Sequence, residues 1–362
     1  MLRPDGPRRV PAFLPPAALY DRIYGAWLGR AAGCLLGRPV EKWPKKRIEE
    51  TLRYCNAWPL DDYFPPVPPN DRGLGYWQGN LSCLRGNITQ MVRDDDMDYP
   101  ILGLHLLEEN GPKFISADVA GQWLSHLPFH MVYTAERVAY RNLVNGIPAP
   151  LSGRHHNPYR EWIGAQIRAD MWGWVNPGEP ERAAAMAYRD AEVSHVKNGT
   201  YGEMFFAALL AAAFVVDDIE ELIVVGLSEI PEECRLAEAV RDTLSWSKES
   251  EDWEETFRRI EGKYGHYHGT HTINNAALVL MGLLHGKKDL GRTIGIAVMG
   301  GWDTDCNGAT AGSVVGTLLG AEALPEAWVK PLNDRIASAV VGFGDMRISE
   351  LAERTCRQVE RI

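Results

Sequence analysis

The chain has 362 residues, and its 38 lysines and arginines against 48 aspartates and glutamates give a formal net charge of -10. Apolar residues make up 45% of the sequence and charged residues 24%, which is typical of a globular protein and excludes a largely disordered chain. An acidic surface repels nucleic-acid phosphates, so no nucleic-acid partner is expected. The longest apolar run, residues 204–216, is too short to cross a bilayer, so no membrane association is expected.

The six cysteines are scattered and contain no C-x-x-C pair. This spacing predicts neither a zinc knuckle nor a disulfide framework and favours a reducing compartment. Residues 1–16 are broken by prolines and lack a continuous apolar segment, so they are interpreted as a flexible N-terminal extension and not as a signal peptide. We therefore expect a cytoplasmic protein.

Helical spacing of apolar residues dominates the chain, and alternating strand patterns are nearly absent. The sequence therefore predicts an all-α fold in one compact domain that spans residues 1–362. Two long segments, 56–80 and 146–180, are predicted loops that cover the functional site, although a solvated connector is equally compatible with the first. In chain order, the predicted helices cover residues 17–36, 99–109, 116–126, 133–145, 179–195, 202–216, 231–246, 272–285, 307–321 and 346–360.

Two of these helices carry a glycine at every fourth position. Each glycine inside a helix costs roughly 1 kcal/mol relative to alanine, so eight of them require a structural reason. A period of four places each set along one helix face, where the missing side chains let another backbone approach closely. We therefore expect two buried central helices in close contact. The glycines are Gly25, Gly29, Gly33 and Gly37 in the first helix, and Gly308, Gly312, Gly316 and Gly320 in the second.

Acidic residues cluster at three places: residues 93–98 (RDDDMD), residues 300–307 (GGWDTDCN) and Glu41. Helix capping accounts for one or two carboxylates but not for so many close together, because their mutual repulsion grows as solvent is excluded. No lysine or arginine occurs in residues 94–112 or 293–329, so a cation is expected at these carboxylates. Oxygen ligands favour Mg²⁺, Mn²⁺ or Ca²⁺ over zinc, and two clusters make two ions plausible.

The histidines are less informative. His195 precedes a long apolar helix, and His266, His268 and His271 lie in one segment. This segment lacks the H-E-x-x-H spacing of a zinc-binding helix, and a structural role is the commoner outcome for each histidine.

Taken together, these motifs resemble the ADP-ribosylglycohydrolase family over most of the chain. GAWLG at residues 25–29 and GRPVE at residues 37–41 are similar to the opening helix of that family, and the aspartates at 94–96 fall on its T-D-D motif. WDTDCN at residues 302–307 resembles its G-D-T-D-T-N motif, and residues 164–168 fall loosely on its substrate loop. His195 matches the histidine that precedes the long apolar helix.

The resemblance implies an all-α fold with two Mg²⁺ ions, or Mn²⁺ in some members, in a central cleft. It implies a metal-dependent hydrolase that cleaves an N- or O-glycosidic bond of a small-molecule or protein-linked ribosyl substrate of the ADP-ribosyl type. The implied metal ligands are Asp94, Asp95, Asp96, Asp303, Asp305 and Cys306. The implied catalytic residues are Glu41, Asp95 and Asp305, and the implied substrate-binding residues are Gln166, Arg168, Asp170, His195, Asn198 and Tyr201.

The sequence departs from the family pattern in its metal shell, as a divergent bacterial branch would. Asp94 replaces a usual Thr or Ser and adds negative charge, whereas Cys306 replaces a Thr and offers a sulfur that suits Mg²⁺ poorly. We therefore expect Asp94 to be a direct metal ligand and Cys306 a weak or absent one, with a purely capping role for Asp94 as the alternative.

Two other functions fit parts of the pattern. Residues 94–98 also read as D-D-x-x-D, which binds Mg²⁺-diphosphate in all-α prenyl and terpene synthases, but the Asp303–Asp305 pair lacks the i, i+4 spacing of their second motif. Turnover of a prenyl diphosphate would identify that class. The second alternative is a catalytically inactive family member that acts as a binding or structural protein, and the absence of Mg²⁺ binding in calorimetry would favour it.

Overall fold

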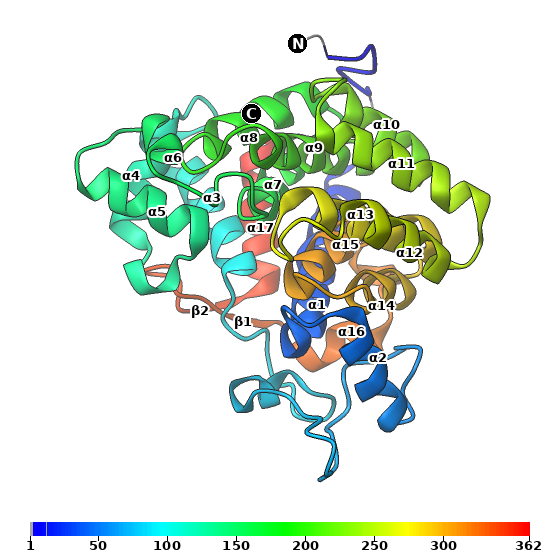
Figure 1. Cartoon of the computed structure of the whole chain (residues 1–362). Coiled ribbons are helices and arrows are strands. Elements are labelled where there is room, and N and C mark those ends of the chain that lie inside the picture. Colours follow the sequence, from blue (N-terminus) through cyan, green and yellow to red (C-terminus); the bar gives the residue numbers. More distant parts are fainter. Residues whose placement is uncertain (1–2, 12) are drawn as a thin grey trace.

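The computed structural model describes residues 3–11 and 13–362 and confirms the predicted all-α fold (Figure 1). One small antiparallel sheet pairs β1 (Arg335–Ala337) with β2 (Asp345–Arg347), and Arg335 lies opposite Arg347. The helices are α1 (Pro16–Gly37), α2 (Lys45–Tyr54), α3 (Asp95–Asn110), α4 (Ser116–His126), α5 (Thr134–Val144), α6 (Leu151–Arg154), α7 (Ala169–Trp174), α8 (Pro180–Ala191), α9 (Asn198–Ala213), α10 (Ile219–Ser228), α11 (Arg235–Glu249), α12 (Trp253–Tyr264), α13 (Thr272–Gly286), α14 (Leu290–Met299), α15 (Thr304–Leu319), α16 (Glu326–Val329) and α17 (Ile348–Val359).

Helices α1 and α15 lie against each other at the centre of the molecule (Figure 1). Their glycines face each other in antiparallel order, so a Cβ atom on any of them except Gly320 would overlap a backbone carbonyl of the partner helix, whereas one on Gly320 would meet the Asp21 carboxylate. The predicted close contact of the two glycine-striped helices is therefore confirmed. Because the helices are antiparallel, the C-terminal end of α1 meets the N-terminal end of α15. The facing pairs are Gly25 with Gly316, Gly29 with Gly312, and Gly33 with Gly308.

The other helices complete the core around this pair. Helix α17 packs against α1, where the Trp27 indole N–H donates to the Thr355 hydroxyl at 3.1 Å. Helix α9 is buried along nearly its whole length, and the Trp172 indole donates to Glu203 of α9 at 2.9 Å. Trp174 is also fully buried and donates to Ser313 of α15 at 3.2 Å.

The second predicted lid is therefore wrong over most of its C-terminal half. Residues 163–176 are buried and include α7, because this aromatic segment packs between α9 and α15, although Ile163, Gly164 and Ile167 also line the cavity described below. The first predicted lid, residues 56–80, does extend as an irregular segment. It contributes no lining residue to the cavity described below.

Four helices of eight residues or more were not predicted: α2, α10, α12 and α14. Helix α2 buries only Ile48, Thr51 and Leu52 and is otherwise charged, so its apolar period is short. Helices α10 and α14 are short and rich in Ile and Val, and such runs fit a strand or a helix equally well. In α12, apolar residues do recur at helical spacing between Trp253 and Tyr264, so the signal was present.

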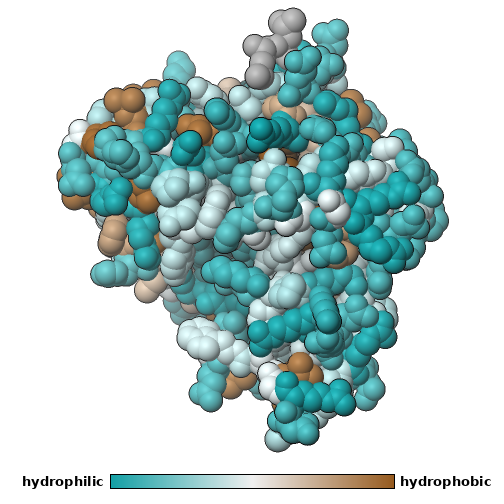
Figure 2. All heavy atoms as spheres, in the orientation of Figure 1, coloured by the Kyte–Doolittle hydropathy of each residue, from teal (hydrophilic) through white to brown (hydrophobic). Residues whose placement is uncertain are grey.

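The described part of the predicted N-terminal extension, residues 3–11 and 13–15, does not behave as a free tail. Arg3 and Arg8 both form ion pairs with Glu229, and the Val10 N–H donates to the Gly178 carbonyl at 2.8 Å. Charge pairing and this backbone bond hold the segment against the helices. Among the described residues, no helix has the length and apolar character needed to cross a membrane. The face in Figure 2 is mostly hydrophilic, with small separate apolar patches.

Candidate metal centre and active site

The central helix pair brings the acidic motifs together at one end. The Thr304 hydroxyl donates to the Gly37 carbonyl at 2.8 Å, which ties the start of α15 to the end of α1. Glu41 follows the last turn of α1, and Asp303 and Asp305 flank the first residue of α15. Helix α3 begins at Asp95, earlier than predicted, because the Asp94 carboxylate caps it by accepting from the Asp96 N–H at 3.1 Å. Three chain segments thus contribute carboxylates to one site.

These segments line a cavity of about 450 Å³. One part of the lining, here called the acidic wall, consists of Glu41, Asp94, Asp95, Asp303, Asp305 and Cys306. A second part, here called the aromatic wall, consists of Arg93, Tyr133, Glu136, Arg137, Trp162 and His268. Of the predicted metal and catalytic residues, only Asp96 lies behind the lining, although it is within reach of the same ligand atoms.

Three groups of side chains place possible metal ligands within 4.8 Å of one another. The first offers only oxygen, and the other two include a buried thiol. Asp305 belongs to the first two groups and could bridge two ions. The groups are Glu41 with Asp303 and Asp305, Asp96 with Asp305 and Cys306, and Cys34 with Asp94 and Asp96.

Unpartnered oxygens support the fit of divalent cations to this site. Among residues 3–11 and 13–362, Asp96 Oδ2 and Asp305 Oδ1 find no hydrogen-bond partner although both atoms are buried. A buried carboxylate oxygen without a partner is costly, and an ion would satisfy it. The oxygen-only group around Asp303 matches the ligand preference of Mg²⁺ and Mn²⁺.

Countercharges exist: Arg93 adjoins the first cluster in the sequence, whereas Arg30 and Arg38 come from the first helix and from the residue that follows it. Arg38 forms an ion pair with Asp94, and Arg93 forms one with Asp98 at 2.7 Å. Arg30, buried in α1, pairs with Asp96 at 3.3 Å. The expectation that these carboxylates lack protein cations is therefore wrong for the first cluster.

The Asp94 carboxylate is compensated by partners within the protein. One carboxylate oxygen caps α3 and the other accepts from Arg38. Both oxygens thus have protein partners, which is the capping alternative in structural form. A direct metal role for Asp94 stays a prediction.

Burial and crowding change the protonation of the remaining carboxylates. Burial raises the pKa of Asp303 to about 7, with a further contribution from Glu41. Burial, reinforced by neighbouring carboxylates, also raises the pKa of Asp95 and Asp305 well above the usual value. The pKa of Asp96 is raised by burial too, although Arg30 opposes the shift. Without an ion, the site therefore holds protons that a bound cation would replace.

This protonation predicts how apo-protein stability depends on pH. Because the pKa of Asp303 rises from 3.8 to about 7 on folding, the native state binds more protons than the unfolded state between these values. The free energy of unfolding should therefore fall as pH rises through this window, and Asp303→Asn should make the slope shallower. Urea denaturation with a chelator at about pH 5 and about pH 8 measures the slope. A slope that Asp303→Asn leaves unchanged would contradict the assignment.

Three of the predicted substrate-binding residues lie in the core. Arg168 is buried and pairs with Glu136 at 2.7 Å and with Asp190 at 2.6 Å. Asp170 is buried and pairs with Arg30 at 2.8 Å. Gln166 is also fully buried. None of the three lines the cavity.

The other three lie near a separate hollow. His195 and Tyr201 line a second cavity of about 470 Å³, and Asn198 donates to Glu161 at 2.8 Å while accepting from the Leu236 N–H. The structure does not place these three residues beside the acidic wall of the first cavity. Their role in substrate binding stays a prediction.

The sequence did not predict that the residues of the aromatic wall lie together. Trp162 and His268 stack with ring centroids 4.2 Å apart and planes 10° apart. The guanidinium of Arg93 donates to the Tyr133 hydroxyl at 3.1 Å. The aromatic composition of residues 146–180 was the available signal for Trp162 and the histidine-rich segment that for His268, whereas nothing local marked Tyr133.

Comparisons with known proteins agree with the architecture. The family model for ADP-ribosylglycohydrolase matches residues 15–361. A solved structure described as an "ADP-ribosylglycohydrolase-related protein complex" superposes with a TM-score of 0.59 at 18% identity, over 95% of this chain and 99% of that chain. That similarity shows the fold. No curated protein matches the chain. Because the family model spans nearly all of the sequence, the chain belongs to the ADP-ribosylglycohydrolase family.

Proposed function

We propose that the protein is a metal-dependent hydrolase that cleaves an N- or O-glycosidic bond of a ribosyl substrate of the ADP-ribosyl type. Membership of a glycohydrolase family supports hydrolysis as the reaction. The observation that carries the proposal is the cavity of about 450 Å³, whose lining combines a group of carboxylates with aromatic and basic side chains. A sugar held in this cavity would have its anomeric carbon beside the carboxylates.

The proposed cofactor is a pair of divalent ions, with Mg²⁺ at the oxygen ligands and Mn²⁺ as the alternative. Glu41, Asp303 and Asp305 would hold the first ion, because their oxygens lie within 4.8 Å of one another. Bound ions would fix the sugar hydroxyls and stabilise developing negative charge. Asp95, which lines the cavity, is the predicted additional ligand.

Glu41 is the best placed general base. It lines the cavity, its side chain is 35% exposed, and it is paired with Lys42 at 2.8 Å. A carboxylate that is open to the cavity can take a proton from an attacking water. Asp95 and Asp305, once a bound ion has displaced their protons, would stabilise positive charge on an oxocarbenium-like sugar.

The aromatic wall would hold the rest of the substrate. The stacked rings of Trp162 and His268 offer a flat apolar face for a sugar or base. Arg93 and Arg137 also line the cavity and would favour a diphosphate. The partner is therefore a small-molecule or protein-linked ribosyl compound. All six cysteines are free, which supports the proposed cytoplasmic location.

A matched substrate panel tests the reaction. Purified protein with Mg²⁺ or Mn²⁺ is incubated with N-linked and O-linked ADP-ribosyl compounds, and with the same linkages on ribose alone. Release of free ADP-ribose or ribose is the expected result, with the ADP-containing compounds preferred. Metal binding without hydrolysis of any compound would favour an inactive family member. Turnover of a prenyl diphosphate would instead support the synthase alternative.

Glu41→Gln is expected to lower kcat by about 100-fold or more while weakening ion binding less, because glutamine keeps one oxygen that can reach the ion but cannot accept the proton of water. Steady-state kinetics and calorimetry on the same preparation measure the two quantities. Glu49→Gln is the control, since Glu49 lies on α2, pairs with Lys45 at 2.9 Å and is absent from the cavity lining. Unchanged turnover in Glu41→Gln would reduce Glu41 to a structural residue.

A further inference from the structure

The two donor groups that share Asp305 differ in chemistry. Glu41, Asp303 and Asp305 offer only carboxylate oxygens, whereas Asp96, Asp305 and Cys306 offer two oxygens and one sulfur within 4.8 Å of one another. Cys306 lies in the first turn of α15 and is only 7% exposed. Both Asp96 Oδ2 and Asp305 Oδ1 are buried and unpartnered among the residues that the structure describes. The sulfur-containing group therefore has two carboxylate oxygens free to bind an ion.

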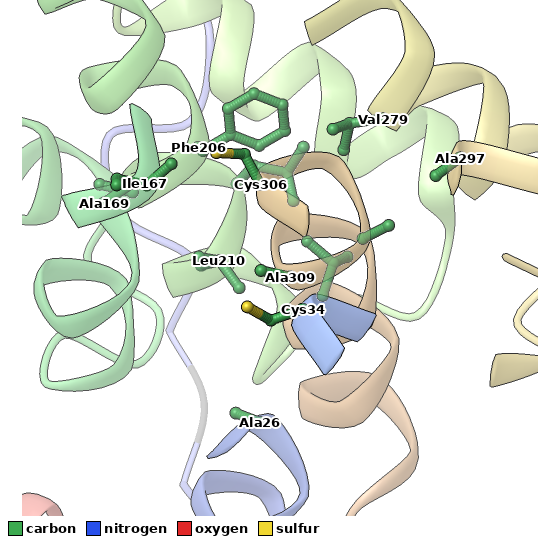
Figure 3. Close-up of a cluster of buried hydrophobic side chains, with 14 of the residues drawn as sticks. Ala26, Cys34, Ile167, Ala169, Phe206, Leu210, Val279, Ala297, Cys306 and Ala309 are labelled. Atoms are coloured by element: carbon green, nitrogen blue, oxygen red, sulfur yellow. The ribbon is translucent and has the colours of Figure 1, made fainter. Parts of the chain in front are cut away.

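Apolar side chains pack near Cys306, while Asp96 and Asp305 lie within reach of its sulfur. Figure 3 shows Cys306 among buried side chains that include Ile167, Phe206 and Ala309. A thiolate in such a place needs a strong positive partner, because burial disfavours its charge. Mg²⁺ is a poor partner for sulfur, whereas Zn²⁺, Fe²⁺ and Co²⁺ accept thiolate together with carboxylate.

We propose that Asp96, Asp305 and Cys306 form an ion position that selects a thiophilic divalent cation of the Zn²⁺ and Fe²⁺ class. This position lies beside the oxygen-only position of Glu41, Asp303 and Asp305, and the two share Asp305. The inference rests on the metal centre of the proposed function and replaces a uniform pair of Mg²⁺ ions by a mixed pair. On binding, the Cys306 thiol releases its proton to solvent and the sulfur bonds to the ion, with no change in oxidation state.

A simpler role for Cys306 is hydrogen bonding to Asp96, for which the thiol is well placed. Threonine and serine would keep that role through their hydroxyl groups, but they cannot supply sulfur. The two roles are therefore separable by substitution. Cys34 is the other buried thiol near Asp96, but its group includes Asp94, whose oxygens already bind Arg38 and the Asp96 N–H. We therefore assign the sulfur ligand to Cys306.

Co²⁺ is the probe, because a thiolate bound to Co²⁺ gives a charge-transfer band in the near ultraviolet. Chelator-stripped full-length protein is titrated with Co²⁺ and then challenged with excess Mg²⁺, and the retained metal is counted by elemental analysis. The wild type should show the band at one Co²⁺ per chain, and Mg²⁺ should not remove it. Cys306→Thr should lose the band and bind Co²⁺ at least about 10-fold to 100-fold more weakly. Cys34→Ala and the distant control Cys356→Ser should retain it.

Each result supports or overturns the assignment. Loss of the band in Cys34→Ala but not in Cys306→Thr or Cys306→Ser would move the ligand to Cys34. Absence of the band in wild type that still binds two Mg²⁺ ions would overturn the mixed pair and leave the proposed function intact. Failure to bind any divalent ion would overturn both. Far-ultraviolet circular dichroism of every variant checks that lost binding does not reflect unfolding, and Asp96→Asn gives a second route to the same site.

Discussion

An Asp303→Asn/Asp305→Asn double variant is expected to lose divalent-ion binding and hydrolysis together while remaining folded. Asparagine keeps the shape of both side chains and removes the charges that attract the cation. Asp305 belongs to both donor groups that face the cavity, so its loss should affect both ion positions. We expect ion affinity to fall by more than about 100-fold, since even indirect support of a ligand contributes about 10-fold to 100-fold.

The same variant should be more stable than the wild type when no ion is present. One pKa unit corresponds to about 1.36 kcal/mol, and the pKa of Asp303 is raised from 3.8 to about 7. Removing its charge above neutral pH should therefore raise the free energy of unfolding by a few kcal/mol, and Mg²⁺ should no longer add stability.

Calorimetry with Mg²⁺ and urea denaturation with a chelator test both parts. Asp345→Asn is the control, because Asp345 is exposed on β2 and pairs only with Arg335 among the described residues. Full ion affinity in the double variant would remove the central group of the proposed metal centre. A variant that is less stable than the wild type without ions would contradict the picture of crowded, uncompensated carboxylates.

A Gly33→Ala/Gly308→Ala variant is expected to lose much of its stability. A Cβ on either residue would overlap the carbonyl of the facing glycine, and a backbone cannot move aside as a flexible side chain can. Overpacking costs about 1–3 kcal/mol per site, against a gain of roughly 1 kcal/mol in helix propensity. For the pair these values give a net loss of up to about 4 kcal/mol, and ion affinity should fall as well, because Glu41, Asp303 and Asp305 lie at the ends of these two helices.

Gly121→Ala provides a matched comparison for the glycine substitutions. Gly121 lies inside α4, and a Cβ there would meet nothing within 4 Å. The substitution should therefore raise stability by up to about 1 kcal/mol. Chemical denaturation of both variants measures the difference. Equal stability of the Gly33/Gly308 variant and the wild type would show that the central helices can separate at no cost.

The features that the sequence predicted can be recognised from local patterns of residues. The period of four glycines predicted the close contact of α1 and α15, because a missing Cβ has few other uses inside a helix. The crowding of acidic residues at 94–96 and at 303–305 predicted a cation at each cluster, because repulsion of that size requires compensation. Only the family resemblance implied that the two clusters share one cleft. Each of these patterns is visible within its own stretch of sequence.

The parts that were missed depend on contacts between distant segments. Arg30 of α1 pairs with Asp96, and Arg38, just after α1, pairs with Asp94. These cations are 66 and 56 residues away from their carboxylates in the sequence, so local sequence does not reveal them. Trp162 and His268 become one stacked wall only after residues 146–180 and the turn before α13 are brought together. The buried use of Arg168 and Asp170 likewise depends on partners in other helices.

The two walls of the cavity are encoded in separate stretches of the chain. The acidic wall comes from the end of α1 and the starts of α3 and α15, and the glycine contact joins α1 to α15, whereas Tyr133, Trp162 and His268 come from connections between other helices. Mutations in those connections can reshape the specificity for the leaving group without disturbing the acidic site. A library that varies only these three positions could therefore redirect this scaffold toward new glycosides while the hydrolytic apparatus is inherited unchanged.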